Sequence, residues 1–64
     1  MAIIFMSNIK TGSVVVVSNP HPDSFAYRGT IGKVVSIRNG KITIKSDNGY
    51  FSTWQEKELL YLHD

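Results

Sequence analysis

The chain has 64 residues, among them seven Lys or Arg, five Asp or Glu and no cysteine. A chain of this length forms one domain and buries only about 60% of the surface of its unfolded state, which argues against a large internal substrate cavity. The lack of cysteine excludes a disulfide framework and removes the commonest ligands of a structural zinc ion, and it fits a reducing, cytoplasmic setting. The net charge of +2 permits nucleic-acid binding without requiring it. We therefore expect one domain over residues 1–64.

The first ten residues, MAIIFMSNIK, contain three consecutive apolar residues at positions 3–5. This run is too short for the core of a signal peptide, and no basic residue precedes it. We expect residues 1–10 to form an N-terminal extension or an extra strand, and the sequence leaves open whether Met1 or Met6 is the start. The longest apolar run elsewhere, residues 14–17, is far shorter than the roughly 20 residues of a transmembrane helix. No association with a membrane is expected.

The first strand is predicted from four consecutive valines that are followed by Asn19-Pro20. A β-branched run bounded by turn residues indicates a strand, here over residues 13–18, with both faces covered. The next segment, NPHPDSFAYRG, contains two prolines, an Asp, a Ser and a Gly. It should form a long irregular loop, and loops of this length in compact domains often carry function.

A β-hairpin is predicted around Asn39-Gly40, because a type I′ turn needs positive φ at both central residues. The turn fixes the register of the two strands. The predicted pairs are Arg38 with Lys41, Ile37 with Ile42, Ser36 with Thr43, Val35 with Ile44 and Val34 with Lys45. The core face of this hairpin is expected to hold Val35, Ile37, Ile42 and Ile44. The opposite face then presents three cations to solvent: Arg38, Lys41 and Lys45.

The second turn, SDNGY, allows two registers for the following strand. A two-residue Asn48-Gly49 loop pairs Ile44 with Thr53 and turns the alternate residues outward beside Lys45. Those outward residues are Tyr50, Ser52 and Trp54. A three-residue loop over residues 47–49 reverses the strand and exposes Phe51 and Thr53 instead. We favour the two-residue loop.

The C-terminal segment QEKELLYLHD begins with polar residues and continues with an apolar run at positions 59–62. It is too short for an independent helix and predicts a 3₁₀ turn before a last short strand. The whole sequence thus predicts an all-β fold with five strands, a long early loop and tight later turns. A small closed or nearly closed antiparallel barrel is expected, because closure protects strand edges.

The segments TGSVVVVSN, YRGTIGKVVSI and GKITIK together resemble the KOW-type SH3-like barrels of ribosomal proteins and transcription elongation factors. The resemblance covers about residues 11–62. Its most specific part is Gly29-x-x-Gly32-x-Val34, a glycine-flanked turn into a long bent strand. The family pattern implies a buried Val34, which the hairpin register places outward; a β-bulge near Lys33 would reconcile them. The resemblance implies an SH3-like five-stranded barrel that contacts RNA or DNA or docks onto another protein.

Our first functional hypothesis is nucleic-acid binding without catalysis. Cations neutralise phosphates, and aromatic rings stack on bases. The expected phosphate contacts are Arg38, Lys41 and Lys45, with Lys33 and Arg28 at the rim. The expected stacking residues are Trp54 and Tyr50. The competing structural explanations are that the lysines serve solubility and edge protection, and that Trp54 simply fills the core.

The second hypothesis is a protein-binding module of the accessory or inhibitor kind. It would use the loop over residues 20–27 and aromatic side chains that exceed what a small core holds. The candidate contacts are Phe25, Tyr27, Trp54 and Tyr61. Self-association through residues 3–5 or the last strand is a further hypothesis, because a marginal core gains stability from it.

An enzyme is not expected. His21 and His63 lie far apart in the sequence, and neither has an Asp or Ser partner at a defined offset. The carboxylates fall in turns or at the end of the chain, so neither a metal site nor a cofactor site is predicted. Type II dihydrofolate reductases are also SH3-like barrels, but their Val-Gln-Ile-Tyr active-site run is absent from this sequence.

Overall fold

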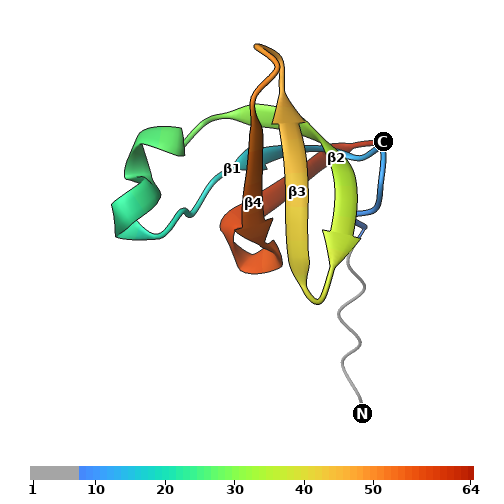
Figure 1. Ribbon diagram of the computed structural model, residues 1–64, viewed down its shortest axis with the longest axis horizontal. Helices are drawn as coiled ribbons and strands as arrows, with labels where there is room; N and C mark the ends of the chain where they lie inside the picture. Colours follow the sequence, from blue (N-terminus) through green and yellow to red (C-terminus); the bar gives the residue numbers. More distant parts are fainter. Residues whose placement is uncertain (1–7) are drawn as a thin grey trace.

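The computed structural model describes residues 8–64 and consists of a five-stranded antiparallel sheet with two short 3₁₀ helices (Figure 1). The elements in chain order are β1 (Val14–Val17), η1 (Pro22–Tyr27), β2 (Ile31–Arg38), β3 (Lys41–Ser46), β4 (Phe51–Gln55), η2 (Glu56–Glu58) and β5 (Leu59–His63). The predicted all-β class with five strands is confirmed. Residues 1–7, and with them the expectations for the apolar run at 3–5 and for Met6, lie outside the described residues. Residues 8–10 belong to no strand.

The strand order across the sheet is β4-β3-β2-β1-β5, so β4 and β5 form its two edges. Strands β1 and β5 cross behind β3 and β4 (Figure 1). The predicted closure into a barrel is not present, because in the described chain no backbone pairing joins β4 to β5. None of the helices found over residues 8–64 has the length and apolar character needed to cross a membrane.

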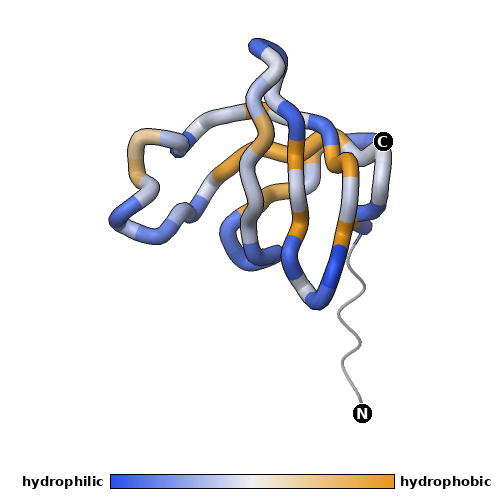
Figure 2. Tube along the Cα trace, in the orientation of Figure 1, coloured by the Kyte–Doolittle hydropathy of each residue, from blue (hydrophilic) through white to orange (hydrophobic). Residues whose placement is uncertain are grey.

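The hydrophobic core lies between the two halves of the bent sheet and draws on all five strands. Its buried side chains are Val15, Val17, Val34, Ile42, Ile44, Trp54 and Leu59, with the partly buried Ile9 packed against them. Figure 2 shows the apolar positions alternating with polar ones along the central strands. Val14 and Val16 remain half-exposed, so only one face of β1 is fully covered, where the sequence predicted two.

The long loop between β1 and β2 contains 3₁₀ structure where an irregular loop was predicted. Pro22 occupies the first position of η1, where the missing N–H costs no hydrogen bond. The Nδ1 of His21 accepts a hydrogen bond from the Asp23 N–H at 3.1 Å, and the Ser24 N–H donates to the His21 carbonyl at 2.7 Å. The segment is interrupted at Ser24 by non-helical angles, and no residue within it is buried.

The first hairpin turns at Asn39 and Gly40, which both have positive φ, at 50° and 76°. The three pairs nearest the turn are those predicted, ending with Ser36 opposite Thr43. Beyond them the register shifts by one residue at Val35, so that Val34 rather than Val35 lies opposite Ile44. This bulge buries Val34, as the family resemblance implies. The predicted core is wrong at two positions: Val35, which lies at the bulge, and Ile37, which keeps its predicted partner Ile42, are both exposed.

The second hairpin has the three-residue loop over residues 47–49, and the favoured two-residue loop is wrong. Lys45 lies opposite Phe51, and Ile42 lies opposite Trp54. Trp54 therefore points into the core and is only 5% exposed. This register buries the largest side chain of the chain, and its indole N–H donates to the Ser52 hydroxyl at 2.8 Å. Phe51 and Thr53 face solvent in its place.

Gly32 lies where β2 has neighbours on both sides, Val15 of β1 and Ser46 of β3. A Cβ atom at this position would lie 2.9 Å from the carbonyl oxygen of Lys45 and 3.1 Å from the Cδ1 of Ile44. The first of these contacts is with backbone, which cannot move aside as the end of a side chain can. The close packing of β2 on β3 therefore requires glycine here.

We predict that Gly32→Ala lowers the free energy of unfolding by about 1–3 kcal/mol, as overpacking does in a close-packed interior. Urea denaturation followed by Trp54 fluorescence measures this change. The control is Lys33→Ala at the next, exposed position, which should change stability by no more than about 0.5 kcal/mol. Equal stability of Gly32→Ala and the unchanged protein would contradict the close approach described above.

Candidate functional site

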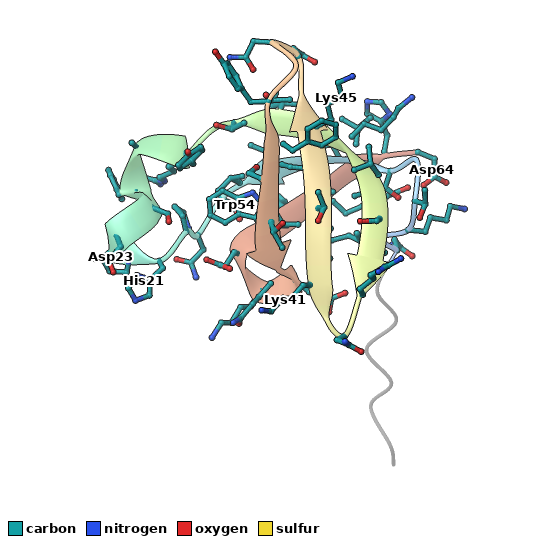
Figure 3. The ribbon with its side chains drawn as sticks, in the orientation of Figure 1. His21, Asp23, Lys41, Lys45, Trp54 and Asp64 are labelled. Carbon is teal, nitrogen blue, oxygen red and sulfur yellow. The ribbon has the colours of Figure 1, made fainter. Side chains whose placement is uncertain are left out.

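The outer face of β2 and β3 carries two pairs of like charges. Lys33 lies opposite Lys45, and Arg38 lies opposite Lys41. Lys41 and Lys45 mark the two ends of β3 (Figure 3), and four residues of strand place them about 13 Å apart. We refer to these four cations as the basic face. The sequence predicted the convergence of Arg38, Lys41 and Lys45, and the bulge at Val35 adds Lys33, which was placed at the rim.

No carboxylate lies within ion-pair distance of these four cations in the described structure. The five acidic residues lie in η1, in the β3–β4 turn, in η2 and at position 64. Within residues 8–64, Lys10 and Asp64 form the one ion pair between two charged side chains, at 3.5 Å. Like charges directly opposite each other on adjacent strands destabilise a sheet. The basic face therefore does not contribute to folding through its charge.

Edge protection does not explain the basic face either. Charged side chains prevent unwanted strand pairing when they lie on an edge strand, whereas β2 and β3 are internal strands. The edge strand next to them is β4, whose outward residues are uncharged: Phe51, Thr53 and Gln55. Of the structural explanations considered for the lysines, only solubility remains.

An exposed aromatic ring lies beside the cations. Phe51 is 64% exposed, and the Lys45 ammonium lies 5.6 Å from the centre of its ring. The hydroxyls of Thr43 and Thr53 are 3.0 Å apart and lie between the two like-charge pairs. The surface thus offers cations, an aromatic ring and hydroxyl groups together. Phe51 was not among the predicted site residues, because the favoured register of β4 turned it inward.

Three of the residues predicted to contact nucleic acid are not part of this surface. Trp54 is buried, and its ring meets that of Tyr27 edge-on at 5.5 Å between centroids. Arg28 follows η1, where its guanidinium lies 5.8 Å from the centre of the Phe25 ring. Tyr50 precedes β4 and lines a pocket beside this surface.

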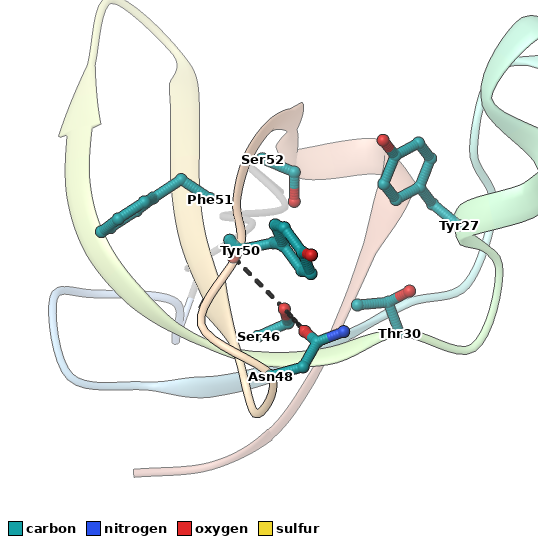
Figure 4. Close-up of a pocket in the computed structure, with 7 residues that line it drawn as sticks. All are labelled: Tyr27, Thr30, Ser46, Asn48, Tyr50, Phe51 and Ser52. Atoms are coloured by element: carbon teal, nitrogen blue, oxygen red, sulfur yellow. Dashed lines mark hydrogen bonds between the residues drawn. The ribbon is translucent and has the colours of Figure 1, made fainter.

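This pocket, of about 300 Å³, lies between the end of η1 and the β3–β4 turn. Two exposed tyrosine rings, Tyr27 and Tyr50, stand across it from one another (Figure 4). Its lining residues are Tyr27, Thr30, Ser46, Asn48, Tyr50, Phe51 and Ser52. None of these lining residues carries a charge. Sequence reasoning did not bring them together, because they come from two separate segments, residues 27–30 and 46–52.

The start of the early loop is held to η2 by Glu58. Its carboxylate accepts hydrogen bonds from the Gln55 N–H at 2.9 Å and the His21 N–H at 3.1 Å. Its carbonyl oxygen accepts from the N–H groups of Ser18 and Asn19. The hydrogen bond from Gln55 is the main reason that the pKa of Glu58 lies below its ordinary value, with a smaller contribution from the His21 N–H.

Of the remaining candidates, Phe25 and Tyr27 are exposed, whereas Tyr61 is half-buried. The Tyr61 hydroxyl donates to Asp64 at 2.9 Å, which raises the pKa of Tyr61 and lowers that of Asp64.

Over residues 8–64 there is no group of three His, Cys, Asp or Glu side chains that could hold a metal ion. Comparison of the chain with protein-family models, curated proteins and solved structures found no match.

Because the pKa of Glu58 is lowered in the folded state, its carboxylate stabilises the fold above its ordinary pKa of 4.5. This contribution is lost as the pH falls through the lower folded-state pKa. We predict that Glu58→Ala lowers the free energy of unfolding at neutral pH by about 1 kcal/mol, the typical worth of such hydrogen bonds. The difference from the unchanged protein should shrink on acidification. Denaturant curves between neutral and acidic pH measure it.

Glu56→Ala is the matched control. It removes a carboxylate from the same turn, and this carboxylate makes neither of the two hydrogen bonds. It should leave the pH dependence of stability unchanged. A difference between Glu58→Ala and the unchanged protein that persists at low pH would show that the carboxylate is not the stabilising form.

Proposed function

We propose that this protein is a small, non-catalytic nucleic-acid-binding module that contacts phosphates through the basic face and a base through Phe51. The observation that carries the proposal is the placement of the cations. Four of the seven Lys and Arg residues share one outer face, where they oppose each other in like pairs on internal strands. Such an arrangement is unfavourable in the isolated protein and becomes favourable when a polyanion neutralises it.

The KOW-type SH3-like barrel belongs to the same proposal. It is supported by the strand order with β5 beside β1, by the long early loop, and by the 3₁₀ turn before the last strand. The buried Val34 and the bulge that follows it fit the family pattern as well. We also propose a cytoplasmic location, for which the cysteine-free sequence is the support.

The composition of the face favours weak and salt-sensitive binding. Each neutralised phosphate contributes about −0.7 to the slope of log K against log salt for a single strand, so four cations give a slope of about −3. One base stacked on an aromatic ring adds roughly 1 to 3 kcal/mol. A protein of this kind depends on low salt, on several copies or on a larger assembly for tight binding.

A protein-binding module remains the second candidate, and one observation favours it. No residue of η1 is buried, and Phe25 is 60% exposed at the tip of the early loop. Exposed aromatic side chains on a loop are typical anchors of protein interfaces. The partner would then dock on the loop, while the basic face would serve solubility.

We predict that Lys45→Gln weakens binding to a single-stranded oligonucleotide and reduces the magnitude of the salt slope by about 0.7. The same substitution should leave stability unchanged or raise it by a few tenths of a kcal/mol, because it removes repulsion with Lys33. Fluorescence anisotropy at several salt concentrations and urea denaturation give the two readouts. Lower affinity without lower stability is the signature of a binding residue.

Lys57→Gln is the matched control, since it makes the same change of net charge on η2, off the basic face. It should alter affinity much less than Lys45→Gln. Equal effects of the two substitutions would indicate diffuse attraction without a defined site. Absence of binding to DNA, RNA and duplex at low salt would overturn the proposed function.

For the second candidate, Phe25→Ala should abolish capture of a protein partner while leaving affinity for oligonucleotides unchanged. Pull-down with the immobilised protein and its Phe25→Ala variant measures the first effect, and anisotropy measures the second. Retention of the same captured protein by both variants would argue against docking on the early loop.

A further inference from the structure

The pocket between Tyr27 and Tyr50 is distinct from the basic face in its chemistry. It is lined by uncharged residues, and the two tyrosine rings are 50% and 71% exposed. Its volume of about 300 Å³ lies at the small end of ligand sites, which suits one planar ring system rather than a folded peptide segment. A phosphate or an acidic peptide would find no charged partner among its lining residues.

Polar groups in the pocket leave hydrogen-bonding capacity for a ligand. The Ser46 hydroxyl donates to the Asn48 side-chain oxygen, which leaves the Asn48 amide N–H groups without a partner in the described structure (Figure 4). The Ser52 hydroxyl accepts from the Trp54 indole and retains its own proton to donate. Donors beside aromatic rings match the edge and the faces of a nucleobase.

The walls of the pocket are held in place from both sides. On one side, the Tyr27 ring rests edge-on against the buried Trp54 ring. On the other, the β3–β4 turn is closed by the Ser46 N–H donating to the Tyr50 carbonyl at 2.9 Å and the Gly49 N–H donating to the Ser46 carbonyl at 2.8 Å. The Tyr27 ring and the backbone of the turn would therefore need little ordering on binding.

The pocket also adjoins the basic face. Phe51 belongs to both: it contributes to the pocket lining, and its ring lies beside Lys45 on the outer face. In the sequence it directly follows Tyr50. A strand whose phosphates lie on the basic face can thus pass the edge strand β4 and turn one base into the pocket.

We propose that the pocket binds one unstacked nucleobase of a single-stranded nucleic acid whose phosphates lie on the basic face. This inference rests on the proposed function and specifies its ligand as single-stranded, because a paired base within a duplex cannot enter. Tyr27 and Tyr50 flank the base, and Asn48 and Ser52 donate hydrogen bonds to its edge.

The test measures Tyr50→Ala against two probes, a fluorescein-labelled single-stranded decanucleotide and an abasic strand with the same number of phosphates. Tyr50→Ala should weaken binding of the base-bearing strand roughly 5- to 150-fold, the range for one lost stacking contact, and leave binding of the abasic strand unchanged. Phe25→Ala, which removes an exposed aromatic ring outside the pocket, should change neither. Thermal denaturation checks that both variants fold.

The outcomes separate this inference from the proposed function. Suppose that the unchanged protein binds oligonucleotides and that Lys45→Gln weakens this binding. If Tyr50→Ala then has no effect, or affects both strands equally, the assignment of the pocket to a base is wrong and the proposed role of the basic face stands. If the unchanged protein binds no strand at low salt, both proposals fail. If free nucleosides bind the pocket and no strand does, its ligand is a small molecule and the inference is overturned.

Discussion

Strand β2 has hydrogen-bonded partners on both sides, and the rest of the structure depends on how it accommodates them. Its first half pairs with β1 and almost its whole length pairs with β3. Two local features make this geometry work. Gly32 lets the backbone of β3 approach to a distance that a Cβ would not allow, and the bulge at Val35 shifts the register so that Val34 enters the core. The bend of the sheet, the enclosed core and the outward position of Lys33 all follow from them.

The same bend separates the residues that fold the protein from those that we propose to bind. Inward residues of β2, β3 and β4 are apolar or small and pack around Trp54. Most outward residues of these strands are basic, hydroxylic or aromatic, and none of them makes an ion pair in the described residues. A substitution on the outer face can thus change binding without changing the fold. The pocket between Tyr27 and Tyr50 lies beside the edge strand β4. It is lined by residues of the early loop and of the β3–β4 turn together.

Local sequence signals predicted the parts of the fold that depend on neighbouring residues. The Asn39-Gly40 turn gave the correct pairs as far as Ser36, and QEKE gave the 3₁₀ turn before the last strand. The bulge at Val35 could not be derived from the hairpin turn, because a turn sets only the pairs nearest to it and the register shift lies beyond Ser36. The observed register of β4 buries Trp54. The sequence of the turn alone does not indicate which side chains of the strand will be buried. The Tyr27–Tyr50 pocket is likewise invisible in the sequence, since it depends on where η1 lies relative to a distant turn.

The pairing of β1 with β5 has a consequence for how this chain acquires its structure. Strands β2, β3 and β4 form a meander of short connections, whereas β1 and β5 come from opposite ends of the described chain. Local contacts form faster than distant ones, so the meander should assemble first and β5 should dock last. Until it does, β1 is an uncharged run of four valines with one unpaired edge, the kind of segment that recruits other chains. With this order of assembly, we expect the docking of β5 to cover that edge and to protect the folding chain from aggregation.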